Sequence, residues 1–269
     1  MAMNSKGEFI IADGVILKVK VFDRRGQFMH HVSLPDHNVD QESFLVVDVA
    51  VDMNDNFYVL VKLFKLHYSG SEFVVSMFNN NGEMHHQFPV KVEVHVNNSP
   101  AMIVDSKRKV VIKGNRHLKE SSVVDDDVEN DGQFVRSFGE GLLRCSVNDL
   151  ALASDDRVIV LDGDSYVHMF SEHGDHLSKF KHTLGSALPY KRTIAFHHSS
   201  EHLVLADVGL LYVYLHIYTK DGELVRSTKI YVEGIGESLR RMIVTAEGHV
   251  ALLNTPELFT RPRNVFIVC

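Results

Sequence analysis

Cysteine is scarce in this sequence, which contains only Cys145 and Cys269 among its 269 residues. Two cysteines cannot form a disulfide scaffold, and their scarcity favours a reducing compartment, so we expect a cytoplasmic protein. Long apolar stretches are also missing, because there is no run of about 18 apolar residues and residues 1–6 lack the apolar core of a signal peptide. The sequence therefore predicts neither a membrane-spanning helix nor a membrane partner.

A basic excess is missing as well, since 28 Lys and Arg residues against 35 Asp and Glu residues give a formal net charge of −7. Dedicated nucleic-acid binders are usually basic over the whole domain, so this charge argues against a DNA partner. It also weakens the case for an RNA partner, although a local basic patch could still bind RNA.

Helical periodicity is missing too, because no window keeps a helical repeat of apolar residues over a dozen positions.

Hairpin signals recur instead. The clearest is Ile217–Val225, in which strand-forming residues flank the turn Lys220-Asp221-Gly222. Related segments have an apolar pair, a short polar turn with one glycine, and a second apolar strand. The turn glycines are Gly26, Gly82, Gly132, Gly174 and Gly222. We expect positive φ angles at these turns, where a Cβ would be unfavourable.

A second polar turn lies upstream of each of these five hairpins, and a sixth follows the last of them; each is followed by a short apolar strand. The first apolar residues of these strands are at positions 9, 57, 110, 158, 203 and 250, which gives steps of 48, 53, 48, 45 and 47 residues. Each unit therefore reads as a four-stranded meander of strands a, b, c and d. A repeat of this length is typical of a propeller blade. Six polar a–b turns predict an all-β, six-bladed β-propeller of four-stranded antiparallel blades, which occupies residues 1–269 as a single domain.

The repeats resemble NHL-repeat propellers of the tripartite-motif type. The resemblance rests on the a–b phrase of residues 47–59 (VDVAVDMNDNFYV), the c–d phrase of residues 21–28 (VFDRRGQF), and the Phe138-Gly139 step between blades. The third copy differs, with Asp125-Asp126-Asp127 where strand c is expected.

The chain ends after residues 264–268, which fit a sixth strand c. We therefore expect a C-terminal fragment of a larger protein, with a last blade of three strands and an edge at 265–268.

The resemblance implies an interaction module that recruits substrates or partners for a tripartite-motif ubiquitin ligase. Ligase activity would then belong to a RING domain that this sequence lacks, so we expect this domain not to be an enzyme. Such propellers also bind single-stranded RNA in post-transcriptional regulation, which is the alternative. A metal-dependent propeller lyase or hydrolase is a more distant alternative.

Histidine is abundant, with 17 residues, but its spacing does not predict a metal site. Adjacent pairs such as His30-His31 and His85-His86 point to opposite faces of a strand and cannot chelate one ion. Candidate ligands for a propeller enzyme would be Asp48, Asn148 and Asp149. A strand-end role, in which these side chains satisfy local backbone groups, is the favoured interpretation. We expect no metal, no cofactor and no catalytic residue.

The remaining functional hypothesis is a binding surface. In a propeller the b–c and d–a loops share one face, and these loops are long here and mix basic with aromatic residues. Such a mixture suits single-stranded RNA, whose bases stack on aromatic rings and whose phosphates pair with cations. Acidic residues predicted on the same face should cancel much of the basic charge, so a protein or peptide ligand is our first choice. The alternative interpretation is a solvated rim of mixed charge. The candidate binding residues are Lys62, Lys65, Tyr68, Arg116, Tyr190, Lys191, Arg192, Arg240, Arg261 and Arg263.

Overall fold

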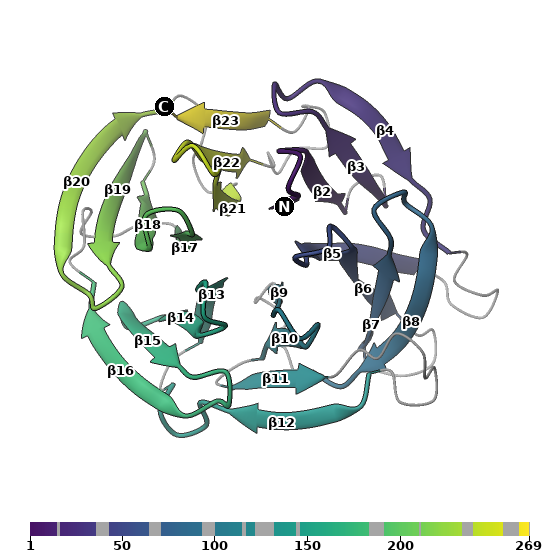
Figure 1. Cartoon of the computed structure of the whole chain (residues 1–269), viewed down its shortest axis with the longest axis horizontal. Coiled ribbons are helices and arrows are strands. Elements are labelled where there is room, and N and C mark those ends of the chain that lie inside the picture. The colour runs from purple at the N-terminus through teal and green to yellow at the C-terminus, as the bar shows by residue number, and fades with distance from the viewer. Residues whose placement is uncertain are drawn as a thin grey trace. The chain divides into compact units, whose positions relative to one another are not determined.

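The structure is a computed structural model that describes residues 1–14, 17–35, 43–64, 71–92, 100–114, 117–121, 132–143, 146–182, 191–209, 211–232, 239–254 and 264–268. These residues form β-strands joined by turns (Figure 1). Among them there is no helix that could cross a membrane. The chain divides into two compact units, Met1–Glu140 and Gly141–Cys269, and each is described by itself.

The first unit contains three antiparallel sheets of four strands. Each sheet is a meander, because hairpin after hairpin joins strands that are neighbours in sequence. The strands are β1 (Ala2–Met3), β2 (Phe9–Asp13), β3 (Lys18–Phe22) and β4 (Phe28–Val32); β5 (Ser43–Val51), β6 (Phe57–Phe64), β7 (Ser71–Phe78) and β8 (Met84–Val90); and β9 (Met102–Val104), β10 (Val110–Lys113), β11 (Leu118–Ser121) and β12 (Phe134–Phe138).

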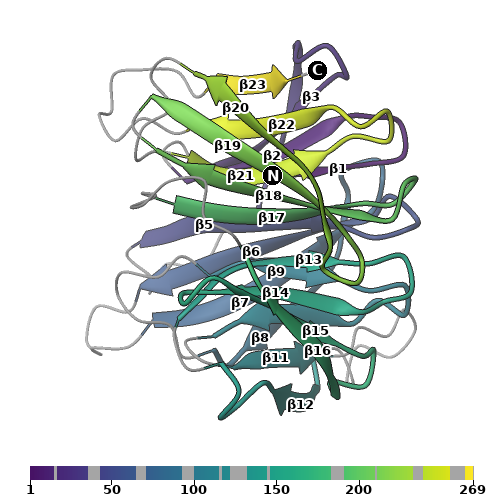
Figure 2. The same ribbon diagram turned by 90° about the vertical axis from the view of Figure 1, so that its left-hand side faces the viewer.

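The second unit contains two further sheets of four strands and one sheet of three. Figure 2 gives a second view of these strands. They are β13 (Val147–Leu152), β14 (Val158–Asp162), β15 (Tyr166–Phe170) and β16 (His176–Lys181); β17 (Lys191–His197), β18 (His202–Val208), β19 (Tyr212–Thr219) and β20 (Leu224–Tyr231); and β21 (Leu239–Val244), β22 (Val250–Asn254) and β23 (Asn264–Val268).

The prediction of a six-bladed propeller is wrong, because the described residues form five four-stranded blades. The expectation of three strands in the last repeat, with an edge at 265–268, is confirmed: β21, β22 and β23 form a smaller sheet in which β23 is an edge strand. The error came from counting a–b turns, of which the sequence has six. A four-stranded blade also needs a c–d turn, and only five such turns with a glycine occur. The c–d turns, not the a–b turns, therefore set the number of complete blades.

Strand c of the third blade also differs from expectation. The sequence pattern predicts it near Asp125–Asp127, which lie outside the described residues. The strand that pairs with β12 is β11, Leu118–Ser121, which comes earlier, in a segment whose sequence predicts a loop. Leu118, Glu120 and Ser121 are buried there despite the polar composition of the strand. The burial of Glu120 explains why an apolar pattern did not reveal this strand.

The turn glycines are confirmed at positive φ: 77° at Gly26, 83° at Gly82, 72° at Gly132, 78° at Gly174 and 91° at Gly222. At Gly222 the turn closes with two backbone hydrogen bonds, from Thr219 N–H to the Glu223 carbonyl at 2.9 Å and from Gly222 N–H to the Thr219 carbonyl at 3.0 Å. The left-handed backbone conformation is one that glycine adopts without the steric cost of a Cβ.

The hydrophobic cores lie between consecutive blades of a unit. In β6, Val59 and Val61 pack with the preceding blade, whereas Tyr58 and Leu60 pack with the following one. Both faces of the strand are buried because successive side chains point to opposite faces of a sheet. This explains why strand b of each blade reads as a nearly continuous apolar run.

Candidate functional site: an exposed patch and a buried polar centre on one blade

Most of the predicted binding residues cannot be placed. Lys65, Tyr68, Arg116, Tyr190, Arg261 and Arg263 lie outside the described residues, and Arg240 belongs to β21, where only its backbone is described. Lys62, Lys191 and Arg192 are placed, on β6 and at the start of β17. That the ten residues share one binding face therefore stays a prediction.

Lys62 and Arg192 are engaged with the protein itself. Lys62 Nζ lies 5.0 Å from the ring centroid of Phe64 and 6.0 Å from that of Phe73. Arg192 Nη1 donates a hydrogen bond of 3.1 Å to the Gly163 carbonyl, and its side chain is only 15% exposed. Arg192 thus connects the β17–β20 blade to the β14–β15 turn of the preceding blade and offers little of its charge to a ligand.

The same blade has an exposed group of side chains that sequence reasoning missed. Leu211, Tyr212 and Tyr231 are 43%, 37% and 58% exposed. The two tyrosine rings meet edge to face, with centroids 5.6 Å apart. Lys229 Nζ lies 3.8 Å from the Tyr212 ring centroid, within the range of a cation–π contact. We call Leu211, Tyr212, Lys229 and Tyr231 the aromatic patch.

Strand register places the aromatic patch at the same end of the blade as Lys191. Lys191 pairs with Val208, Val208 with Val213, and Val213 with Ile230, so these four residues form one row across the blade. Neighbouring strands are about 4.8 Å apart, which places the backbone of β20 roughly 14 Å from that of β17. One predicted binding residue therefore lies across the blade from the aromatic patch.

A signal for the patch was present in residues 212–214, where two tyrosines alternate with a valine. Alternation of this kind indicates a strand with one face outside the core. It does not reveal that Tyr212 and Tyr231 are paired opposite each other on adjacent strands. That pairing depends on the register of the β19–β20 hairpin, which contains a β-bulge between Ile217 and Tyr218.

Asp149, one of the enzyme candidates, links three strands of the second unit. Its Oδ2 accepts hydrogen bonds from the Thr193 hydroxyl and from Ile194 N–H, the latter at 3.1 Å. Its Oδ1 accepts one of 3.0 Å from Arg241 Nη1. Asp149 is buried on β13, and its partners come from β17 and β21. All these contacts are internal, and they join Asp149 to other blades, which a strand-end role on local backbone groups does not predict.

Asp48 occupies the corresponding place in the first unit. Both aspartates follow a β-bulge in strand a of their blade, between Val46 and Asp48 and between Val147 and Asp149. Asp48 Oδ2 accepts a hydrogen bond of 2.9 Å from Met102 N–H of the next blade, and the Met1 nitrogen lies 3.5 Å from its Oδ1. In both units, therefore, an aspartate that follows a bulge in strand a links its blade to the next one.

A buried polar centre lies within the β17–β20 blade and the strand before it. Asp207, at the end of β18, has its Oδ2 3.0 Å from His182 Nε2 and 3.6 Å from His216 Nε2. Arg192 Nε lies 3.5 Å from its other oxygen, Oδ1. Asp207 and both histidines are buried. Among the residues searched, His182, Asp207 and His216 alone form a group with the geometry to hold a metal ion.

Comparable carboxylates end strand b in other blades. Asp13 Oδ2 lies 2.8 Å from Lys20 Nζ, and Asp162 Oδ2 lies 3.2 Å from His168 Nε2. In each case the partner is on strand c of the same blade. Asp207 with His216 is the third example. The β17–β20 blade differs by the additional histidine, His182, which follows β16.

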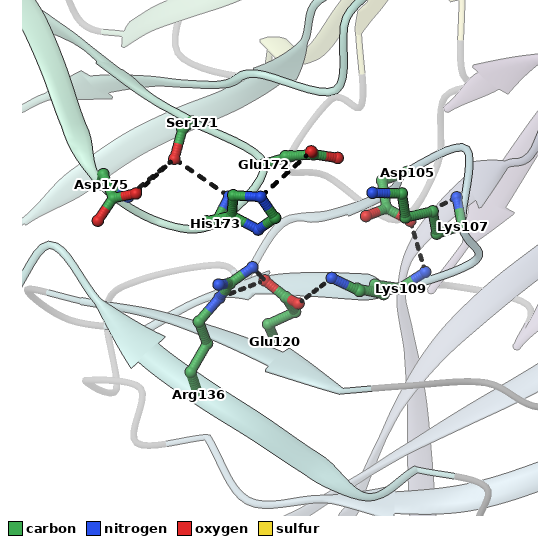
Figure 3. Close-up of polar contacts among 9 residues, drawn as sticks. All are labelled: Asp105, Lys107, Lys109, Glu120, Arg136, Ser171, Glu172, His173 and Asp175. Carbon is green, nitrogen blue, oxygen red and sulfur yellow. Dashed lines mark hydrogen bonds and ion pairs between the residues drawn. The ribbon is translucent and has the colours of Figure 1, made fainter.

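Figure 3 shows two further polar groups, one from each unit. In the first unit, the buried carboxylate of Glu120 lies 3.0 Å from Lys109 Nζ and 2.8 Å from Arg136 Nη2. In the second, the Ser171 hydroxyl donates a hydrogen bond of 3.2 Å to Asp175 within the β15–β16 turn. Glu120 has two cations to compensate its burial, and the Ser171 contact belongs to a turn, so both groups are structural.

No family model matches the sequence. No curated protein matches it either.

Solved structures do match. A crystal structure of a protein of unknown function from Bacteroides caccae has a TM-score of 0.60 and 12% identity, over 85% of this chain and 80% of that one. BBS1N in complex with ARL6DN, soaked with lead, has a TM-score of 0.57 and 14% identity, over 92% of this chain and 71% of that one. The WD40 β-propeller domain of Doa1 has a TM-score of 0.51 and 13% identity, over 94% of this chain and 87% of that one. At such identities the likeness concerns the fold alone, and it shows that this chain is a β-propeller with four-stranded blades.

Proposed function

We propose that this propeller is a non-catalytic interaction module that binds a segment of a partner protein at the aromatic patch. The observation that carries the proposal is the exposure of Tyr212 and Tyr231 beside Lys229 on one blade. Tyrosine is enriched at the centres of protein interfaces because it offers a large apolar surface together with a hydroxyl group.

The chemistry of the patch defines the partner. Leu211 and the tyrosine faces suit apolar side chains, while Lys229 and, across the blade, Lys191 suit carboxylates. A segment that combines apolar with acidic residues therefore fits this end of the blade. The Lys229 ammonium over the Tyr212 ring also restricts both side chains before binding, which lowers the entropy lost on association.

The similar structure of BBS1N was determined in complex with ARL6DN, which fits a protein partner for a propeller of this fold. The resemblance of the repeats to tripartite-motif NHL propellers makes the proposal more specific. On that basis the module recruits substrates or partners for a cytoplasmic ubiquitin ligase whose catalytic domain is a different one.

The test is a selection of random peptides displayed on phage against the purified domain, followed by affinity measurement with the enriched peptides. Tyr212→Ala combined with Tyr231→Ala should weaken binding by about tenfold or more, as expected for interface hot spots. Val225→Ala is the matched control, because Val225 is 56% exposed on the same strand as Tyr231 but at its opposite end. Equal binding by the double variant and the control would refute the assignment of this patch.

Single-stranded RNA is the second candidate ligand, because exposed tyrosines beside a lysine also suit stacked bases and phosphate. The net charge of −7 opposes it at long range. A pool of random-sequence RNA should bind weakly and with little dependence on salt. Submicromolar binding with a log–log salt slope steeper than about −2, lost in Lys191→Glu combined with Lys229→Glu, would replace the protein ligand by RNA.

A further inference from the structure

Three ligand atoms converge in the buried polar centre of the second unit. His182 Nε2, His216 Nε2 and an oxygen of Asp207 all lie within 4.8 Å of one another. The three residues come from different places in the fold, namely the residue after β16, strand β19 and the end of β18. Each is buried, so water does not compete freely for these atoms.

The other nitrogen of each imidazole is already oriented by a hydroxyl group. His182 Nδ1 lies 2.9 Å from the Tyr218 hydroxyl, and His216 Nδ1 lies 2.8 Å from the Ser227 hydroxyl. Histidines that bind a metal usually hold the second ring nitrogen in a hydrogen bond, which orients the ring so that the other nitrogen faces the ion. Both Nε2 atoms are therefore directed to the centre.

His216 supplies an independent indication. Its Nε2 atom is buried and has no hydrogen-bond partner among the described residues. The nearest carboxylate oxygen, Asp207 Oδ2 at 3.6 Å, is beyond hydrogen-bond distance. A buried polar atom without a partner is destabilising unless something else satisfies it. An ion at the centre would be bound by this nitrogen.

We propose that His182, Asp207 and His216 bind one zinc ion. With zinc–ligand bonds of about 2.0–2.1 Å, the ligands of a tetrahedral site lie about 3.3 Å apart. The separations of 3.0 Å and 3.6 Å from Asp207 Oδ2 to the two imidazoles lie on either side of that value. Two imidazole nitrogens and one carboxylate oxygen form a ligand set that suits zinc.

The surroundings define the rest of the coordination. Arg192 Nε lies 3.5 Å from Asp207 Oδ1, so this oxygen faces a cation and Oδ2 serves the metal. The group includes no fourth His, Cys, Asp or Glu from the residues searched, which leaves the fourth position to a water molecule. The Arg192 charge lowers the affinity for a cation, and a zinc-bound water that deprotonates offsets part of this repulsion.

The site would join two consecutive blades. His182 follows β16 of one blade, while Asp207 and His216 belong to the next, and His182 N–H donates a hydrogen bond of 2.7 Å to the Ser165 carbonyl. The ordinary interpretation of the centre is a hydrogen bond between a carboxylate and an imidazole, like that of Asp162 with His168. Among the residues searched, that pair has no third ligand directed at the carboxylate, so it is the matched control for the zinc site.

The experiment measures the zinc content of the tag-free full chain, produced in zinc-supplemented medium, by mass spectrometry of the metal. We expect about one zinc per chain in the wild type and in His168→Gln. We expect less than about 0.1 zinc per chain in His216→Gln and His182→Gln, with folding of each variant checked by circular dichroism. Glutamine keeps hydrogen-bonding capacity in place of the imidazole.

X-ray absorption of the zinc-loaded wild type keeps the test valid if the variants fail to fold. It should show two imidazole ligands together with oxygen ligands only. A wild-type content below about 0.1 zinc per chain would overturn the site and leave only the contacts between the Asp207 carboxylate and the two imidazoles. Zinc that persists in folded His216→Gln, or zinc bound by one imidazole or by three, would assign the metal to surface histidines and overturn it equally.

Discussion

Alanine at Gly222 and alanine at Gly26 test two different effects of a side chain in a turn. Both add a Cβ at a positive φ, but only the Cβ at Gly222 would meet a neighbouring blade. Gly222 has a φ of 91°, and a Cβ there would lie 2.5 Å from Cδ1, 2.6 Å from Cγ and 3.0 Å from Cβ of Phe180. Because Cβ and Cγ of Phe180 are involved, rotation of its ring does not relieve the contact. At Gly26, with a φ of 77°, a Cβ would meet nothing within 4 Å.

The magnitudes differ accordingly. The left-handed conformation costs an L-residue roughly 1–2 kcal/mol, which is the whole effect expected for Gly26→Ala. Overpacking adds typically about 1–3 kcal/mol, so Gly222→Ala should lose about 2–5 kcal/mol of unfolding free energy. Each kcal/mol corresponds to roughly 2–4 °C in the melting temperature of a domain of this size.

Urea denaturation followed by circular dichroism gives the two free energies, and the unfolding slope shows whether the variants unfold like the wild type. A double-mutant cycle with Phe180→Ala, which removes Cγ and Cδ1, isolates the contact. The smaller side chain should relieve part of the Gly222→Ala loss, with a coupling energy above about 0.5 kcal/mol. Equal losses for the two glycine variants together with a coupling energy near zero would refute the packing argument.

Two further predictions concern buried charge. Asp149→Ala removes the buried carboxylate that accepts hydrogen bonds from Thr193, Ile194 and Arg241, and it should lose about 3–5 kcal/mol in urea denaturation. Asp155→Ala removes an exposed pair and should lose less than about 1 kcal/mol; similar losses would contradict the link between strands. Burial lowers the pKa of His176, and the neighbouring His168 and Lys179 lower it further, so protonation favours the unfolded chain. The contribution of His176 to stability is therefore complete above pH 6.5 and falls as the pH drops below it. Titration by NMR should place its pKa below 6.5 and should show a rise in His168→Gln; an unchanged pKa would exclude the coupling.

The sequence by itself determined the features that depend on neighbouring residues. The alternation of apolar residues predicted strands such as β6, and the turn glycines predicted the c–d hairpins, because strand periodicity and positive φ are local requirements. The all-β propeller class followed from their repetition. The number of four-stranded blades and the position of β11 did not follow, because an apolar pattern cannot show which strand pairs with which, or that Glu120 is buried between two cations.

Only the tertiary structure decided where function could reside. Tyr212 and Tyr231 form an exposed patch because a bulged hairpin pairs them, and no local pattern specifies that register. His182, Asp207 and His216 are separated by 25 and 9 positions along the chain, so no short ligand spacing joins them. They converge because strand pairing places β18 beside β19 and blade packing brings the residue after β16 to them. Convergence of this kind depends on the packing of whole blades, whereas the sequence specifies mainly the conformation of each strand and turn.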